Sequence, residues 1–413
     1  MKIRSAHFSG GLSSFFFDDQ AAIKGGAEQD GFVYSGSPRT EGFEAIRQPG
    51  ESVSVLLVLE DGSVAVGDCA AVQYSGAGGR DALFRASLVV AQLEAELRPW
   101  LEGRDVSRFR ENSRALDALR MGDRPLHTAI RYGVSQALLD ATALAQRCLK
   151  AEVLCREFDL PRIAEAVPLF GQTGDDRYHG VDKMILKGVD ALPHGLINNV
   201  PDKLGHRGEK LLEYVSWIVR RISQLRRQED YRPTLHIDTY GTIGLIFEQD
   251  TARIAAYLAR LGEAAGDHPL YVEGPIDAGN RQGQIEALSS LRQALGVAGS
   301  RVRIVADEWC NTYEDIVEFC DAHCCDMVQI KTPDLGCVHH VIEAIRYSRA
   351  KGMESYQGGT CNETDVSARV CVHLALAARP ERMLVKPGMG FDEGMTIVGN
   401  EMQRALTIMR TKG

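Results

Sequence analysis

Apolar and polar positions follow a repeating order over the second part of the chain. From Val167 onward, short apolar runs such as VPLFGQTG, MILKGVDALPHG, TLHIDTYG, PLYVEGPI and RIVADEWC are separated by amphipathic stretches such as EKLLEYVSWIVRRISQLR and TARIAAYLARLGEAAG. The short runs predict buried strands, and the helical periodicity between them predicts one helix after each strand. About eight strand candidates of this kind predict an α/β fold, a TIM-type (β/α) barrel of seven or eight strands.

The pattern before residue 160 does not repeat. KIRSAHF and SVSVLLVLEDGSVAVGDCAAV predict strands, and the second of these contains a hairpin turn at Asp61-Gly62. Helical periodicity follows at roughly 82–102 and 126–150. Strands followed by helices predict an α+β domain. We therefore expect an N-terminal capping domain at 1–160, which covers one mouth of a barrel catalytic domain at 161–413.

Charge and hydropathy argue against a nucleic-acid-binding protein and against a membrane-spanning one. The net charge is −9 without a long basic block, so nucleic acid is not an expected partner. No apolar stretch reaches the ~18 residues that a membrane span needs, and the N-terminus does not resemble a signal peptide. A basic cluster falls on an amphipathic helix, where it predicts a solvated face: Arg220, Arg221, Arg226 and Arg227.

The ten cysteines are expected to be reduced thiols of a cytoplasmic protein, because no secretory signal accompanies them. One group lies at the end of a predicted helix that Thr312 opens: Cys320, His323, Cys324 and Cys325. No second cysteine pair follows at zinc-finger spacing, so core packing is the preferred interpretation of this group.

Three acidic residues each end an apolar run at nearly equal intervals. Asp238, Glu273 and Asp307 are separated by 35 residues (238 to 273) and 34 residues (273 to 307). One βα unit takes ~30 residues, so the three carboxylates should meet at one mouth of the barrel. Carboxylate oxygens in this number predict a Mg²⁺ site.

The run DMVQIKTPD brings Lys331 to the same mouth 24 residues after Asp307. We expect burial and a nearby cation to lower the pKa of Lys331, which would make it a general base. Five further residues are candidates at this mouth: His194 opposite Lys331, Gln172, Gln329 on the strand of Lys331, and Thr360 and Cys361 after Gly358-Gly359. A substrate contact is the preferred role for Cys361, because no histidine adjoins it to activate a nucleophile.

These residues occur in the motifs HIDTYG, VEGPI, ADEW and QIKTPDLG. In their order and motifs, and over its whole length, the chain resembles the methylaspartate ammonia-lyase family of the enolase superfamily. Other branches of the superfamily carry a Lys-x-Lys after the second barrel strand. Here Lys183 and Lys187 have a different spacing, and His194 lies beyond them.

The resemblance implies elimination of ammonia from L-threo-3-methylaspartate to give mesaconate through a metal-stabilised enolate, in glutamate fermentation. It implies Mg²⁺ on Asp238, Glu273 and Asp307, and Lys331 as the base. His194 would serve as the base for the opposite C3 epimer and would hold the metal-bound carboxylate. Gln172, Thr360 and Cys361 would hold the other carboxylate, with Gln329 near the metal and Gln73 closing over the substrate. Activation by K⁺ and a homodimer are also implied.

Three alternatives stay open at this point. Lys331 and His194 could serve another proton abstraction, such as a racemisation or a dehydration. Lys331 could instead form a Schiff base in a metal-free aldolase. A binding protein that kept the barrel without its chemistry is the third alternative, because fold alone does not establish function.

Overall fold

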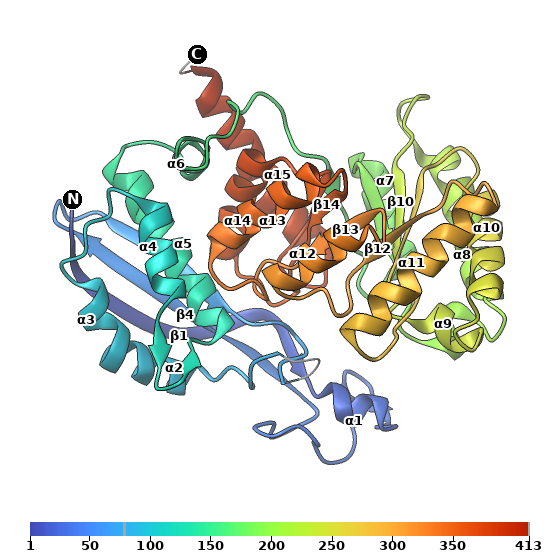
Figure 1. Ribbon diagram of the computed structural model, residues 1–413, viewed down its shortest axis with the longest axis horizontal. Coiled ribbons are helices and arrows are strands. Elements are labelled where there is room, and N and C mark those ends of the chain that lie inside the picture. Colours follow the sequence, from blue (N-terminus) through green and yellow to red (C-terminus); the bar gives the residue numbers. More distant parts are fainter. Residues whose placement is uncertain (77–79, 412–413) are drawn as a thin grey trace.

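The computed structural model describes residues 1–76 and 80–411 and shows an N-terminal domain packed against a closed barrel (Figure 1). In the N-terminal domain, three antiparallel strands form a sheet in the order β1-β4-β5. The bounds are β1 (Ile3–Asp18), β4 (Arg47–Leu59) and β5 (Val64–Ala70), with α1 (Gln20–Lys24), β2 (Gln29–Asp30) and β3 (Val33–Tyr34) between the first two. The hairpin turn predicted at Asp61-Gly62 is confirmed, and Gly62 has a φ of +88°.

Helices cover one face of this sheet. They are α2 (Ala86–Gln92), the π-helical turn η1 (Leu93–Leu97), α3 (Arg98–Leu101), α4 (Phe109–Asp117), α5 (Thr128–Ala145) and α6 (Lys150–Glu157); β6 (Arg120–Met121) and β7 (Arg124–Pro125) form a small hairpin. Glycine allows α5 to approach the sheet closely, because a Cβ at Gly67 would lie 2.3 Å from the Gly133 oxygen. The two helical stretches predicted from periodicity correspond to α2–α3 and α5, whereas α4 was not predicted.

Eight parallel strands close the barrel in the order β10-β11-β12-β13-β14-β15-β8-β9. The strands are β8 (Leu169–Phe170), β9 (Ala191–His194), β10 (Thr234–Asp238), β11 (Leu270–Glu273), β12 (Arg303–Ala306), β13 (Met327–Ile330), β14 (Glu354–Gln357) and β15 (Arg382–Leu384). The predicted barrel is confirmed. Its strands are short and buried, which is why they appear in the sequence as apolar runs without alternation.

The outer layer of the barrel consists of the segments that connect and follow the strands. They are α7 (Arg177–Lys187), η2 (Val200–Leu204), α8 (Glu209–Leu225), α9 (Thr242–Ile246), α10 (Thr251–Ala265), α11 (Arg281–Val297), α12 (Tyr313–Ala322), α13 (Val338–Ala350), α14 (Asp365–Ala378) and α15 (Phe391–Thr411). The strand predicted for MILKGVDALPHG is partly wrong, because its first residues end α7 and only Ala191–His194 is a strand. Gly188 ends this helix with a left-handed φ of +66°. Lys183 and Lys187 therefore lie on the helix before β9, where both pair with Asp392.

The N-terminal domain contacts the loops that follow the barrel strands. Asn362, in the loop after β14, donates to the Phe16 oxygen at 3.1 Å, and Arg80 pairs with Asp334, after β13, at 3.0 Å. Deeper in the contact, Thr364 Oγ1 donates to Asp68 Oδ2 at 2.6 Å. The loops at the carboxyl ends of the strands are thus held by both domains.

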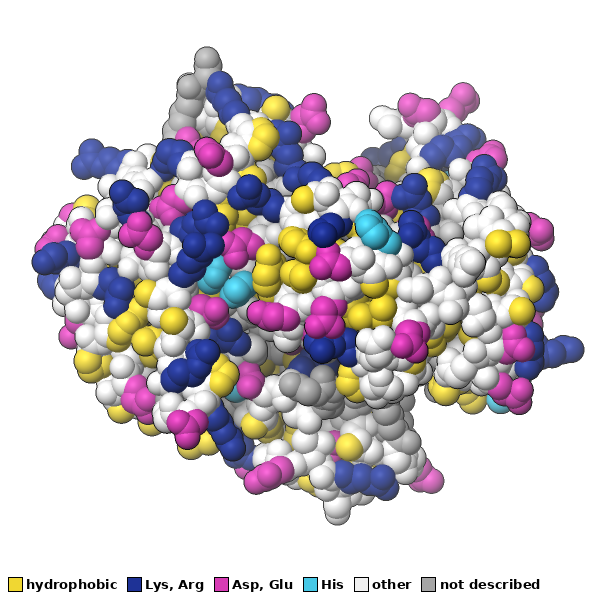
Figure 2. Space-filling view, in the orientation of Figure 1, with side chains coloured by type: hydrophobic (Ala, Val, Ile, Leu, Met, Phe, Trp, Pro, Cys, Tyr) yellow, Lys and Arg dark blue, Asp and Glu magenta, His cyan; other side chains and the backbone are white. Residues whose placement is uncertain are grey.

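The exterior carries charges of both signs. On the face that Figure 2 shows, Lys and Arg side chains are interspersed with Asp and Glu. In the predicted basic cluster, Arg220 is exposed on α8 and Arg221 pairs with Asp182 at 2.6 Å, as expected for a solvated helix face. Arg226 and Arg227 lie beyond the end of this helix at Leu225, so the prediction is wrong for these two. No helix within the described residues is long and apolar enough to cross a membrane.

Candidate active site

The three predicted carboxylates converge at the mouth of the barrel. Asp238 and Glu273 end β10 and β11 and lie opposite each other in the register, and Asp307 directly follows β12. One oxygen from each residue lies within 4.8 Å of the others, and all three residues are buried. Burial, and after it the charges of neighbouring carboxylates, raises the pKa of Asp238 and Glu273 well above the usual range. Buried acids in such mutual repulsion fit a divalent cation, which compensates their charge.

Three donors fix the carboxylate of Glu273. Tyr356 donates its hydroxyl at 2.7 Å, Gln329 Nε2 donates to Oε1 at 2.6 Å, and His236 Nε2 lies 2.8 Å from Oε2. Such outer contacts orient metal ligands and tune their affinity. The predicted residue Gln329 therefore lies at the acidic group, in contact with Glu273. His236 and Tyr356 were not predicted. His236 lies two residues before Asp238 on β10 and so faces the same side of the strand, a signal that could have identified it.

A fourth acid, Glu308, lies beside the three and was not predicted. Its Oε2 is buried without a hydrogen-bond partner among the described residues, and a Cβ at Gly274 would lie 2.7 Å from this oxygen. Burial and the neighbouring Asp307 raise the pKa of Glu308 to about 8. The segment ADEW contains this second acid. If the strand continued through it, alternation would point the Glu308 side chain to the face opposite Asp307. The strand ends at Ala306, so alternation does not apply.

Lys331 lies at the acidic group, one residue beyond β13. Its Nζ donates to Asp307 Oδ1 at 2.7 Å. Burial by itself would lower the pKa of Lys331, but Asp307 and Asp334 raise it above the ordinary value against the opposing charge of Arg80. The neighbouring side chains thus do not produce the predicted lowering of the Lys331 pKa. A lowered pKa would require the positive charge of a bound cation.

His194 lies on the opposite wall, as predicted, because β9 and β13 are four strands apart in the barrel order. Its Nε2 is 3.5 Å from Asp238 Oδ2, and its backbone has a left-handed φ of +63°. Burial lowers the pKa of His194 to about 4. A neutral imidazole therefore faces the ammonium group of Lys331 across the acidic group.

The predicted neutral contacts surround the same mouth. Gln172 follows β8 and donates to the Gly388 oxygen, while Thr360 and Cys361 follow β14. Cys361 donates its thiol to Gln73 Oε1 of the N-terminal domain at 3.3 Å. Burial raises the pKa of Cys361 to about 12, so this side chain is a neutral donor and not a thiolate nucleophile.

Two other groups are unlike this site. Asp117, His339 and His340 also have ligand atoms within 4.8 Å of one another, but Arg131 already neutralises Asp117 at 2.6 Å. Of the group predicted to pack in the core, Cys320, Cys324 and Cys325 are buried, whereas His323 is exposed, so the prediction is wrong for the histidine. All ten cysteines are free thiols.

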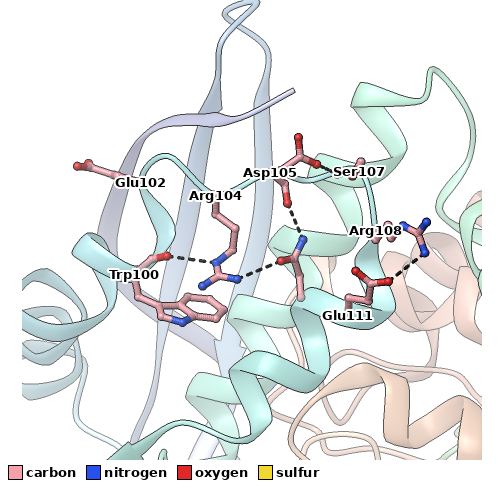
Figure 3. A pocket seen from close by; sticks show the side chains of 8 residues that line it. Trp100, Glu102, Arg104, Asp105, Ser107, Arg108 and Glu111 are labelled. Atoms are coloured by element: carbon pink, nitrogen blue, oxygen red, sulfur yellow. Dashed lines mark hydrogen bonds and ion pairs between the residues drawn. The ribbon is translucent and has the colours of Figure 1, made fainter.

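A separate hollow of about 450 Å³ lies in the N-terminal domain (Figure 3). The Arg104 guanidinium carbon lies 3.5 Å from the Trp100 ring centroid there, and Arg104 donates to Asn112 Oδ1 at 3.2 Å. The hollow is lined by Trp100, Glu102, Arg104, Asp105, Ser107, Arg108, Glu111 and Asn112. None of the predicted site residues lines it.

Comparison with known proteins gives consistent matches over the whole chain. Residues 1–159 match the family description "Methylaspartate ammonia-lyase N-terminus", and residues 162–411 match "Methylaspartate ammonia-lyase C-terminus". The methylaspartate ammonia-lyase of Citrobacter amalonaticus is 62% identical over 412 residues, which cover 100% of both chains.

Solved structures agree with this similarity. The Citrobacter amalonaticus methylaspartate ammonia-lyase containing (2S,3S)-3-methylaspartic acid superposes with a TM-score of 0.98 over 99% of this chain and 100% of its own, at 62% identity. The Mg complex of β-methylaspartase from Clostridium tetanomorphum has a TM-score of 0.96 and 53% identity over 100% of both chains. A muconate lactonizing enzyme of Pseudomonas fluorescens, at 17% identity over 92% of this chain and 85% of its own, shares the fold with a TM-score of 0.61.

Proposed function

The chain belongs to the methylaspartate ammonia-lyase family of the enolase superfamily, and from this membership we infer that it is a carbon–nitrogen lyase that eliminates ammonia from 3-methylaspartate. The observation that carries this function is the full-length match, at 62% identity, to a lyase whose structure contains (2S,3S)-3-methylaspartic acid. Mg²⁺ is its cofactor, in agreement with the Mg complex of a 53% identical relative and with the buried acidic group.

We propose that Asp238, Glu273 and Asp307 hold the Mg²⁺ ion. Their oxygens are close enough to share one ion, and the donors on Glu273 leave little freedom for its carboxylate. A bound Mg²⁺ supplies positive charge that stabilises the negative charge developing on the substrate when C3 loses its proton. Gln329 contributes near the metal by donating to Glu273 Oε1 at 2.6 Å.

We propose Lys331 as the base for the L-threo substrate. As the neutral amine it takes the C3 proton, the electron pair of that C–H bond forms the C2–C3 double bond, and the C2–N bond breaks with its pair on the departing ammonia. The unsaturated product is mesaconate. His194, on the opposite wall and with a pKa of about 4, would hold one substrate carboxylate and accept the proton from the opposite C3 epimer.

Gln172, Thr360 and Cys361 are proposed to hold the second carboxylate. All three lie at the carboxyl ends of β8 and β14, and the thiol of Cys361 is protonated and can donate. Neutral donors suit this role, since they bind an anion without adding charge to a mouth that already carries a lysine and a metal site.

The remaining proposals concern the domain organisation, assembly, activation, location and metabolic role of the enzyme. We propose a capping domain at 1–160 and a catalytic barrel at 161–413, a homodimer, activation by K⁺, a cytoplasmic location and a role in glutamate fermentation. The two family matches at 1–159 and 162–411 support the division into domains.

The test is incubation of the purified protein and Mg²⁺ with L-threo-3-methylaspartate, while ammonia and the absorbance of the unsaturated acid are followed. We expect both to appear together, and EDTA to abolish both. Proton exchange at C3 without ammonia release would favour a racemase instead. Activity that survives EDTA, with trapping of Lys331 by borohydride and a carbonyl compound, would favour the Schiff-base aldolase.

A further inference from the structure

Lys386 is a fully buried ammonium group two residues after β15, and it joins the ends of three barrel strands. Its Nζ donates to Thr332 Oγ1 at 2.8 Å, to Glu363 Oε1 at 2.9 Å and to the Gly358 oxygen at 2.6 Å. The backbone passes so closely over this group that a Cβ at Gly359 would overlap with Nζ. An ammonium has three N–H groups, so all of them are used within the protein.

The three acceptors lie on two loops that carry proposed site residues. Thr332 belongs to the base loop (331–337, after β13), where it directly follows the proposed base. Gly358 and Glu363 belong to the carboxylate loop (358–364, after β14), which contains two of the residues proposed to hold the second substrate carboxylate. One buried side chain therefore connects the group that takes the proton with the loop that holds the substrate.

The hydroxyl of Thr332 has only one possible direction. Because an ammonium only donates, Thr332 Oγ1 accepts from Lys386, and its single proton goes to Glu363 Oε1 at 2.9 Å. Lys386, Thr332 and Glu363 thus form a closed triangle of hydrogen bonds. Each of these bonds involves a charged group, and such bonds are stronger than those between neutral groups.

The N-terminal domain completes this buried group. Tyr132, on α5, is fully buried and donates its hydroxyl to Glu363 Oε2 at 2.9 Å. Both oxygens of Glu363 therefore have donors, and one of the donors comes from the other domain. A buried network in which the polar groups are satisfied makes the segments that it joins rigid.

Proton transfer needs this rigidity, because a misplacement of about 1 Å between base and substrate can cost roughly 100-fold in rate. On the basis of the proposed function, we propose that Lys386 is a positioning residue that holds the base loop and the carboxylate loop at a fixed separation. Lys386 does not touch the substrate, and it acts through Thr332 and Gly358. His194 ends β9 on the opposite wall, so its position does not depend on Thr332.

The substitution Thr332→Val tests the link to the base, because it removes the hydroxyl and keeps the branched side chain. We expect kcat for L-threo-3-methylaspartate to fall roughly 10-fold with a KM within about twofold, since the substrate still binds but Lys331 is no longer held. The kcat for the opposite C3 epimer, which uses His194, should change less than about twofold. A merely structural role of Thr332 would lower both kcat values and leave their ratio unchanged.

The conservative variant Thr332→Ser keeps the hydroxyl and should retain the kcat for the threo substrate within about twofold. Lys386→Met removes both links, so it should also raise the KM for both epimers, roughly 10-fold. Adding Thr332→Val to Lys386→Met should lower the threo kcat little further, because the two residues act through one contact. Thr142→Val is the matched control, since it removes a buried hydroxyl that donates to the Leu138 oxygen within α5 at 2.9 Å.

Circular dichroism selects the folded variants for these measurements. If one of Thr332→Val and Lys386→Met does not fold, the other carries the comparison with Thr142→Val. A threo kcat within twofold of the unsubstituted enzyme in either variant would overturn the inference, as would an equal fall of kcat for both epimers in Thr332→Val. An unsubstituted enzyme that releases no ammonia from 3-methylaspartate would instead overturn the proposed function.

Discussion

The Nζ atom of Lys331 lies 2.7 Å from Asp307 Oδ1, so the proposed base directly contacts a proposed metal ligand. His194 has the corresponding position on the opposite wall, 3.5 Å from Asp238 Oδ2. Each proposed proton acceptor is therefore linked to a different carboxylate of the same acidic group. We therefore expect metal binding, protonation and the choice of substrate epimer to be coupled through these two contacts.

Replacing the two acceptors should separate the epimers. Lys331→Ala is expected to reduce turnover of L-threo-3-methylaspartate by roughly 10³-fold or more, since general base catalysis and the positioning of the base are both lost. His194→Ala should damage the reaction of the opposite C3 epimer more severely. Lys351→Ala, at the exposed end of α13, is the control for lysine removal. Substantial turnover of the threo substrate by folded Lys331→Ala would contradict the base assignment.

The affinity for Mg²⁺ should rise with pH. The pKa values of Asp238 and Glu273 are raised by burial and neighbouring carboxylates, and Asp307 and Asp334 raise that of Lys331 against the effect of its burial. Protons on these groups compete with the cation, so binding releases them and strengthens by up to about tenfold per pH unit for each proton. Calorimetry in buffers of different ionisation enthalpy counts the protons. A dissociation constant that is the same at pH 6 and pH 9 would contradict this coupling.

Tyr356→Phe should weaken Mg²⁺ binding without unfolding the barrel. The hydroxyl donates to both oxygens of Glu273, at 2.7 and 2.9 Å, and its loss frees this carboxylate to rotate. We expect a roughly 10- to 100-fold weaker affinity by calorimetric titration. Tyr271→Phe is the matched control, because its hydroxyl donates to Glu354 at the opposite end of the strands, at 2.8 Å. Equal effects of the two substitutions would remove the role assigned to Tyr356.

Lys386→Met should destabilise the whole protein. Lys386 and Glu363 are fully buried and lie 2.9 Å apart, and Lys386 also donates to Thr332 at 2.8 Å and to the Gly358 oxygen at 2.6 Å. Removing the ammonium leaves a buried carboxylate without a counter-charge, which costs about 3–5 kcal/mol in urea unfolding. Adding Glu363→Gln should restore part of this loss. A double variant no more stable than Lys386→Met would show that charge pairing is not the reason.

The contact of Glu401 with α14 should make the free energy of unfolding fall as the pH becomes acidic. The hydrogen bond from His373, and after it the hydrogen bond and the charge of Arg369, lower the pKa of Glu401 to about 2 against the effect of burial. Its contribution is therefore present above the unfolded value of ~4.3 and is lost as the pH falls toward 2. Glu401→Gln should cost about 1–2 kcal/mol at pH 7 and much less near pH 2. Glu381→Gln, at an exposed position, should show no such difference between the two pH values.

Local patterns were sufficient for the barrel and for most of the candidate site. The nearly equal spacing of Asp238, Glu273 and Asp307 follows from the length of a βα unit, and a residue that ends a buried strand must lie at the mouth. For the same reason, the sequence places Lys331 and His194 on opposite walls of the barrel. Hydrophobic periodicity failed at MILK, where a left-handed Gly188 ends a helix just before a short strand.

The sequence alone determined the repeat of elements and the chemistry delivered to one mouth, because both depend on residues that are close along the chain. Only the tertiary structure decided which groups constrain that chemistry. Tyr356 and Glu273 meet across the closed barrel, and Tyr132 of the N-terminal domain reaches Glu363 of the barrel. Such contacts join residues that are distant in sequence, so they depend on barrel closure and domain packing and leave no period in the chain.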